Sequence, residues 1–163
     1  MTKNPAPTLA AVLGESPNAM ERLRTAVREG NDSPFTADSL LDRVEQFRVE
    51  SMEIVPAAAD ALERGDLTRL GALVDESQAN AERLLGNQVP ESIELARSAR
   101  QLGAVAASAF GAGFGGSVYA LVRASEADAF QRRWAARYEK AIPARAADAK
   151  FLITRAGPAA TRL

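Results

Sequence analysis

The sequence predicts an α+β fold in which helices pack on a small antiparallel sheet. Apolar residues recur at spacings of three and four from Thr36 to Leu102, which is the period of helices. The period changes at Ala104, where two short apolar runs flank a segment with four glycines, a pattern that indicates strand, loop and strand. Helices first and strands later favour an α+β layer fold over an alternating α/β one.

The first half of the chain is predicted to be a short lead-in followed by a helical hairpin. Residues 1–35 carry prolines and glycines around one helical stretch near 18–29, so we expect a loosely structured lead-in, with the folded domain at 36–163. Thr36 is a good N-cap for a long helix to about residue 64, and Pro56 should kink that helix. Gly65 ends it, and Asp66 caps a second helix that ends near residue 86.

The second half should contain the sheet. Pro90 opens a third helix that runs to about residue 102. Strands are expected at 104–110 and 117–122, and a final strand at 151–154. Ser125, with Asp128 three residues on, resembles a capping box at the start of a helix that turns Trp134 inward. The predicted order is α-α-α-β-β-α-β.

Composition excludes several classes of function. With 20 basic and 21 acidic residues the formal net charge is -1, so no overall positive charge drives nucleic-acid binding. It has neither cysteine nor histidine, so disulfides, thiolate chemistry and the commonest general base and metal ligand are absent. No apolar run is long enough to span a bilayer and the start lacks the apolar core of a signal peptide, so we expect no membrane partner and a cytoplasmic protein.

The glycine segment is where backbone amides could approach a ligand. Gly111 to Gly116 fits G-x-G-x-x-G, but the dinucleotide version of that motif needs a helix directly after the loop, and here a strand-like run follows. A protein-kinase glycine loop fits the strands, yet Val-Ala-Ile-Lys, His-Arg-Asp and Asp-Phe-Gly are all missing. The alternative is a tight connection that needs glycines for backbone reasons alone.

Gly-Ala-Val-Ala-Ala-Ser-Ala-Phe at 103–110, followed by Gly-Ala-Gly-Phe-Gly-Gly-Ser-Val, resembles the third signature motif of galactokinases. That family shares a superfamily with homoserine, mevalonate and phosphomevalonate kinases. The resemblance extends over residues 38–158 and includes 41–47, 65–67 and Ser77-Gln78. Two departures stand out: Ser-Ala-Phe at 108–110 replaces the usual Arg-Met-Thr, and Ser117 replaces the usual cysteine.

The resemblance implies a ferredoxin-like C-terminal domain of an ATP-dependent sugar kinase, short of one edge strand that the other half would supply. It implies ATP and Mg as cofactors of the complete enzyme, with the nucleotide side of the cleft shaped by five loop residues: Gly111, Gly113, Phe114, Gly115 and Gly116. No catalytic residue and no metal ligand is assigned in this chain. The serine-rich phosphate-binding loop, the sugar-binding signature and the aspartate base of the family are absent from this sequence, so the chain alone is expected to be catalytically silent.

The surface that the missing half would cover is expected to be apolar and to border the glycine loop. The expected partner is therefore an N-terminal kinase half, or a second copy of the chain bound to this surface. A non-catalytic binding or regulatory module, or a folded relic of such a kinase, remains the alternative.

Other groups are given structural roles. Glu45, Glu50 and Glu53 are interpreted as a solvated helix face, and core packing is favoured over an adenine pocket for Phe114 and Tyr119. Three arginines are interpreted as surface charge: Arg132, Arg133 and Arg137.

Overall fold

The computed structural model describes residues 8–157, so the first seven residues of the predicted lead-in and the last six of the predicted domain lie outside the described part. The chain divides into two compact units, Met1–Gln88 (unit 1) and Val89–Leu163 (unit 2). Each is described by itself. The domain boundary at residue 35 stays a prediction.

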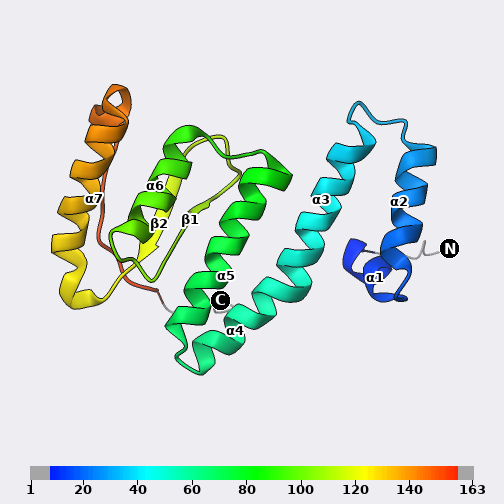
Figure 1. Ribbon diagram of the computed structural model, residues 1–163, viewed down its shortest axis with the longest axis horizontal. Coiled ribbons are helices and arrows are strands. Elements are labelled where there is room, and N and C mark those ends of the chain that lie inside the picture. Colours follow the sequence, from blue (N-terminus) through cyan, green and yellow to red (C-terminus); the bar gives the residue numbers. More distant parts are fainter. Residues whose placement is uncertain (1–7, 158–163) are drawn as a thin grey trace, which may run out of the picture. The chain divides into compact units, whose positions relative to one another are not determined.

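In its described part, unit 1 has helices and connecting loops but no strand (Figure 1). Its α-helices are α1 (Leu9–Gly14), α2 (Ala19–Gly30), α3 (Ala37–Val49), α4 (Val55–Glu63) and α5 (Leu67–Asn80). Two π-helical turns extend them, η1 (Glu50–Ile54) between α3 and α4 and η2 (Ala81–Leu85) after α5. The stretch expected near 18–29 is α2, and the long helix expected from 36 to 64 is the run of α3, η1 and α4.

Local chemistry explains where these helices begin and break. The Thr36 hydroxyl accepts a hydrogen bond from the Ser39 amide at 3.2 Å, and the Asp66 carboxylate accepts one from the Arg69 amide at 2.9 Å, so both predicted N-caps are confirmed. The π-helical turn lies directly before Pro56, whose ring nitrogen has no hydrogen to donate to the helix. The predicted kink at Pro56 is therefore a π-helical interruption.

The helices α4 and α5 run side by side as the predicted hairpin. Gly65, with a φ of 67°, permits the reversal between them. The core of unit 1 is formed by one apolar face of each helix together with the end of η1. Its buried residues are Ile54, Ala61, Leu70 and Leu73.

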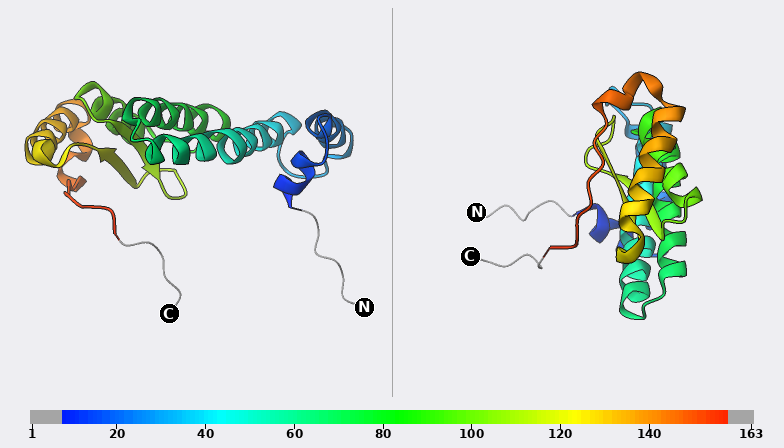
Figure 2. Two further views of the ribbon diagram at one scale, coloured as in Figure 1. Left: turned by 90° about the horizontal axis from the view of Figure 1, so that it is seen from below. Right: turned by 90° about the vertical axis from the view of Figure 1, so that its left-hand side faces the viewer.

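Unit 2 contains the sheet. Its elements are α6 (Pro90–Gln101), β1 (Ala106–Phe110), β2 (Ser117–Leu121), a 3-10 turn at Ala124–Glu126, α7 (Ala127–Ala141) and a second 3-10 turn at Pro143–Asp148. Strands β1 and β2 pair antiparallel, with Ala106 opposite Leu121 and Phe110 opposite Ser117. Figure 2 shows α6 and α7 in one layer and the two strands in another, which is the predicted α+β arrangement.

The core of unit 2 lies between the two layers. Its buried residues are Ala99, Ala104, Ala107, Phe130 and Trp134, and Val118, Ala120, Val122 and Phe151 pack against them. The side chains of β2 alternate, because even-numbered positions face the helices and odd-numbered positions face away. The outer face of the sheet therefore carries Phe110, Tyr119 and Leu121, all three exposed.

Two local predictions for unit 2 are wrong. Residues 151–154 are extended but form no strand, because within residues 8–157 no backbone hydrogen bond joins them to a neighbour. The described sheet accordingly has two strands. The capping box at Ser125 is not formed either: a 3-10 turn holds Ser125, and α7 begins after Glu126, which makes no side-chain cap bond.

Candidate functional site

The glycine loop joins β1 to β2 and has a backbone that few side chains tolerate. Gly111, Gly113, Gly115 and Gly116 have φ angles of 100°, 86°, 110° and 110°. Positive φ angles are strained for residues that carry a Cβ, which explains the glycines. Backbone amides in such a turn can point toward one place, a geometry that suits an anion. A strand follows the loop directly, so the dinucleotide-binding interpretation of G-x-G-x-x-G is excluded.

Phe114, at the tip of this loop, is both strained and exposed. Its φ is 59°, and it is the sole non-glycine residue with positive φ between residues 8 and 157. Its side chain is 76% exposed, so no packing within unit 2 compensates for the strain. The expectation that Phe114 and Tyr119 pack in the core is wrong, since Tyr119 is exposed as well. Strain of this kind that persists on a surface points to a contact outside the fold.

We expect Phe114→Gly to leave the isolated chain as stable as before or up to about 1 kcal/mol more stable. Relief of the left-handed strain, about 1–2 kcal/mol, is offset in part by the greater freedom of glycine in the unfolded chain. Urea titration of the variant beside Phe114→Ala, which removes the ring but keeps the strain, measures this. A loss of stability in both variants would mean that the ring packs within the chain.

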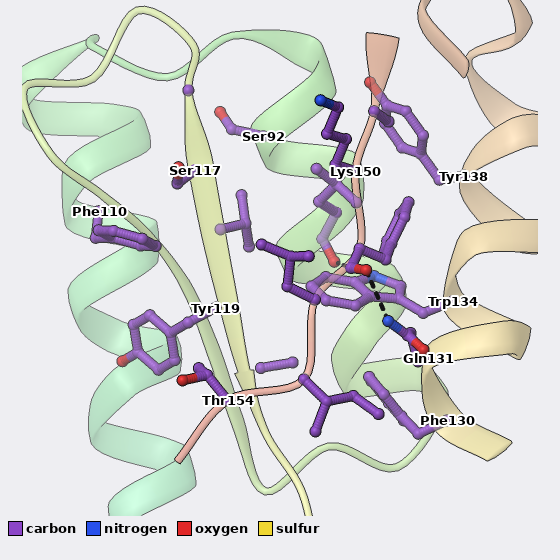
Figure 3. A pocket seen from close by; sticks show the side chains of 18 of the residues that line it. Ser92, Phe110, Ser117, Tyr119, Phe130, Gln131, Trp134, Tyr138, Lys150 and Thr154 are labelled. Atoms are coloured by element: carbon purple, nitrogen blue, oxygen red, sulfur yellow. Dashed lines mark hydrogen bonds between the residues drawn. The ribbon is translucent and has the colours of Figure 1, made fainter. Parts of the chain in front are cut away.

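A large groove opens beside the loop, between β2 and the extended segment 149–156; we call it the β2 groove (Figure 3). Its volume is about 1330 Å³. Phe114, Gly115 and Gly116 form one end of it. Ser92 and Leu95 of α6 and Phe130, Gln131, Trp134 and Tyr138 of α7 also line it. The sequence did not indicate this site, because its two walls, β2 and the segment 149–156, are far apart along the chain.

Trp134 lies at the centre of the lining and is fixed from several directions. Its ring nitrogen donates a hydrogen bond to the Leu95 carbonyl at 3.1 Å, which ties α7 to α6. Its ring lies 5.6 Å from that of Phe130 and 5.2 Å from that of Phe151. The inward orientation predicted for Trp134 is thus confirmed, with 9% of the residue exposed.

Gln131 is a groove residue that the sequence analysis missed. Its amide nitrogen donates a hydrogen bond to the Phe151 carbonyl at 2.7 Å and so anchors the outer wall to α7 (Figure 3). A signal was available, because Gln131 precedes Trp134 by three positions and Tyr138 by seven, which places it beside the apolar face of α7. A polar residue on such a face requires a partner.

The end of the groove near Tyr138 is polar. Arg145 and Glu91 form an ion pair there, with nitrogen and oxygen 3.6 Å apart, and Asp148 and Lys150 also line the wall. Burial raises the pKa of the Tyr138 phenol, and the negative charge of the nearby Glu91 carboxylate raises it further. Tyr138 is therefore un-ionised at neutral pH and can serve as a hydrogen-bond donor.

The other charged residues considered from sequence have structural partners. Arg48 bonds to Glu45 at 2.8 Å and also pairs with Glu53, while the Glu50 carboxylate accepts a bond from the Ser77 hydroxyl at 2.9 Å. The Arg48 guanidinium lowers the pKa of Glu45. Glu45 and Glu50 are partly buried rather than fully solvated. Within residues 8–157 no cluster of three or more acidic, histidine or cysteine side chains is placed so that it could hold a metal ion.

Arg132 and Arg133 are exposed as expected, but Arg137 is more than surface charge. Its Nε lies 3.5 Å from Oε1 of Glu94, a buried carboxylate of α6 that also pairs with Arg97. That Glu94 oxygen has no hydrogen-bond partner in the described structure. A buried carboxylate depends on neighbouring charge, so Arg137 helps hold α7 on α6.

We expect Arg137→Ala to lower the free energy of unfolding by about 1 kcal/mol. The loss is smaller than for a fully buried ion pair, because Arg97 and Arg137, the two partners of Glu94, are both exposed to solvent. Thermal melts at low and high salt measure the loss. Arg133→Ala, one turn earlier and exposed, is the matched control and should change nothing. Equal melting temperatures for the two variants would contradict the role given to Arg137.

No helix within residues 8–157 is long and apolar enough to cross a membrane. Residues 58–140 match the model of the family described as GHMP kinases C terminal, which is half of the chain. The chain belongs to this family.

The relatives within the family are galactokinases. The chain is 35% identical over 96 residues to the galactokinase of Limosilactobacillus reuteri, a match that covers 58% of this chain and 24% of the relative. It is 35% identical over 89 residues to that of Thermococcus kodakarensis, covering 55% of this chain and 25% of the relative. The resemblance deduced from the glycine motif is confirmed.

A solved structure agrees. The crystal structure of Lactococcus lactis galactokinase complexed with galactose is similar with a TM-score of 0.61 and 27% sequence identity, over 77% of this chain and 36% of that one. The predicted galactokinase-like C-terminal fold is therefore confirmed. The matches span about a quarter of the length of the curated relatives.

Proposed function

We propose that residues 36–163 form the C-terminal domain of an ATP-dependent sugar kinase of the galactokinase type, which works only with a polypeptide that carries the phosphate-binding loop. The observation that supports this most is the glycine loop: a strained, exposed backbone between antiparallel strands, in a chain that aligns with galactokinases. The sugar is galactose or a close analogue, and the kinase is cytoplasmic.

In this proposal the five loop residues, 111, 113, 114, 115 and 116, position the nucleotide and do not react with it. Phosphoryl transfer depends mostly on positioning and on stabilisation of the charge on the transferred group. Backbone amides of the loop supply fixed dipoles at no reorganisation cost, and the Phe114 ring gives an apolar contact to the nucleotide or to the facing loop. The catalytic base and the Mg ligands come from the partner polypeptide.

A non-catalytic module is the second candidate, and one observation favours it. Phe110 stands where the family has threonine at the start of the loop, and this side chain is 57% exposed. An exposed phenylalanine cannot supply the polar contact that threonine would make. The module would keep the fold and bind a partner on this face without taking part in phosphoryl transfer.

A chimaera tests the proposal. The 96 matched residues of the L. reuteri galactokinase are replaced by the residues of this chain that align with them. We expect galactose-dependent ATP consumption by the chimaera and none by the chain alone, because the loop positions a nucleotide that other residues must bind. Circular dichroism establishes that the chimaera is folded. A folded chimaera without turnover supports the non-catalytic module.

The isolated chain provides the complementary measurement. We expect calorimetric titration with ATP and magnesium to give no detectable heat at micromolar concentrations. Tight ATP binding by the chain alone would contradict its dependence on a partner polypeptide.

A further inference from the structure

The backbone of β2 has an edge that faces the β2 groove. The Leu121 carbonyl accepts a hydrogen bond from the Val105 amide at 2.8 Å, so the backbone groups of Leu121 point toward β1. Backbone groups alternate in direction along an antiparallel strand, so those of Val118 and Ala120 point to the opposite edge, into the groove. No backbone hydrogen bond within residues 8–157 joins this edge to another segment.

The opposite wall is also extended and also lacks backbone pairing. Residues 150–157 make no backbone-to-backbone hydrogen bond with any described residue. Side chains hold them instead: Gln131 bonds to the Phe151 carbonyl, and the Phe151 ring packs on Trp134 and on Tyr138. The predicted strand at this position is thus held in place as a wall although no partner strand is present.

The two walls have the same direction. Figure 3 shows Ser117 and Lys150 toward one end of the groove and Tyr119 and Thr154 toward the other. One extended segment that runs antiparallel to both would form ladders on its two edges at once. Neighbouring strands in a sheet lie about 4.8 Å apart, and a strand seated between the two walls would join them into a continuous sheet over α6 and α7.

The size and chemistry of the groove fit a peptide better than a small molecule. Small-molecule sites usually have volumes of about 300–1,000 Å³, whereas the groove has about 1330 Å³. Its floor is apolar, with Leu95, Phe130 and Trp134, and its outer rim carries Leu152 and Ile153, which are 85% and 49% exposed. Two extended segments without backbone-to-backbone hydrogen bonds along the groove, beside an apolar floor, are what β-strand addition uses.

We infer that the β2 groove takes one extended strand, antiparallel to β2, that belongs to the polypeptide carrying the phosphate-binding loop. This identification of the source rests on the proposed function, while the strand itself rests on unit 2 alone. The inserted strand has apolar side chains at alternate positions toward Trp134. The glycine loop forms one end of the groove, so a strand seated there brings its own polypeptide next to the loop. The strand missing from the sheet is therefore internal, not at the edge as the sequence had suggested.

A peptide experiment tests the groove independently of the source. Ten-residue random peptides displayed on phage are selected on the full chain. The chain has one tryptophan, so the emission of Trp134 reports occupation of the groove directly. We expect selected peptides to alternate apolar and polar residues, to shift the Trp134 emission to shorter wavelength, and to slow amide exchange in the peptic fragment that covers β2.

Ala120 provides a matched pair of variants. Ala120→Pro removes the amide that points into the groove and leaves the bonds to β1, whereas Ala120→Ser keeps the amide at nearly the same size. We expect at least a tenfold loss of peptide affinity for Ala120→Pro, and less than a twofold change for Ala120→Ser. Thermal melts establish that both variants are folded. Selection of no binder, or equal affinities for the two variants, would overturn the strand site.

Two further measurements identify the occupant. Light scattering gives the mass of the chain alone: a dimer in which β2 amides exchange slowly would show that a second copy fills the groove and would overturn the inference. In the galactokinase chimaera we expect slow β2 exchange without any peptide. An active chimaera with fast exchange of the β2 amides would overturn the strand site but leave the proposed function intact. An inactive chimaera with slow exchange of the β2 amides would support the strand site and contradict the proposed function.

Discussion

Trp134→Ala should lower the free energy of unfolding of unit 2 by about 3–5 kcal/mol, the usual cost of removing a large buried ring. The substitution removes the contacts with Phe130 and Phe151 and the indole donor to the Leu95 carbonyl, which keeps its bond from the Ser98 hydroxyl. Urea unfolding followed by circular dichroism measures the loss, since the variant has no tryptophan to fluoresce. Because typical domains are stable by only 5–15 kcal/mol, the variant should be partly unfolded at 37 °C.

Trp134→Phe separates packing from hydrogen bonding. The phenyl ring keeps most of the aromatic contact but cannot donate to the Leu95 carbonyl, so we expect a loss nearer 2 kcal/mol, about half of it from the hydrogen bond. If Trp134→Phe cost as much as Trp134→Ala, the bond to Leu95 would be what joins α7 to α6. If neither variant were less stable, Trp134 would not belong to the core.

Much of the fold could be predicted because it depends on chemistry within a few residues. Thr36 and Asp66 cap helices through amides three positions on, and Gly65 supplies a positive φ where a helix ends. The glycines at 111–116 likewise separate two strands that pair directly across the loop. Each of these features is encoded where it occurs, so a pattern in the sequence suffices.

The errors arise where structure depends on distant neighbours. Residues 151–154 have the composition of a strand, but a strand also needs a paired backbone on at least one edge, and the groove separates them from β2. Composition reports local preference and not the presence of a neighbour. The 3-10 turn at Ser125 shows the same limit, since the way the chain enters α7 is set by the turn after β2.

The candidate site could be predicted in part. The glycine motif indicated the loop, and its five residues remain a proposal as a nucleotide site. The exposure of Phe114 and Tyr119 was not predicted, because aromatic residues beside a strand are usually buried and only the arrangement of the layers shows which face is covered. The β2 groove was invisible to sequence for the same reason.

Gly115→Ala should reduce the kcat/KM of the galactokinase chimaera by about a hundredfold, the scale on which a misplacement of 1 Å impairs catalysis. Gly115 has a φ of 110°, and an added Cβ would lie 3.9 Å from Val89, an ordinary contact. The strain is therefore in the backbone, about 1–3 kcal/mol, and the loop relieves it by moving the amides that position the nucleotide. Steady-state assays below the melting temperature of the variant measure the effect.

Gly103→Ala is the matched control. Gly103 has a φ of 98° and no atom within 4 Å of an added Cβ, but it precedes β1, at the opposite end of that strand from the glycine loop. We expect the same loss of stability, about 1–3 kcal/mol, with kcat/KM unchanged. Equal losses of activity in the two variants would show that backbone strain anywhere in unit 2 impairs the enzyme. Equal stability with a selective loss for Gly115→Ala would assign the loop its role in positioning ATP.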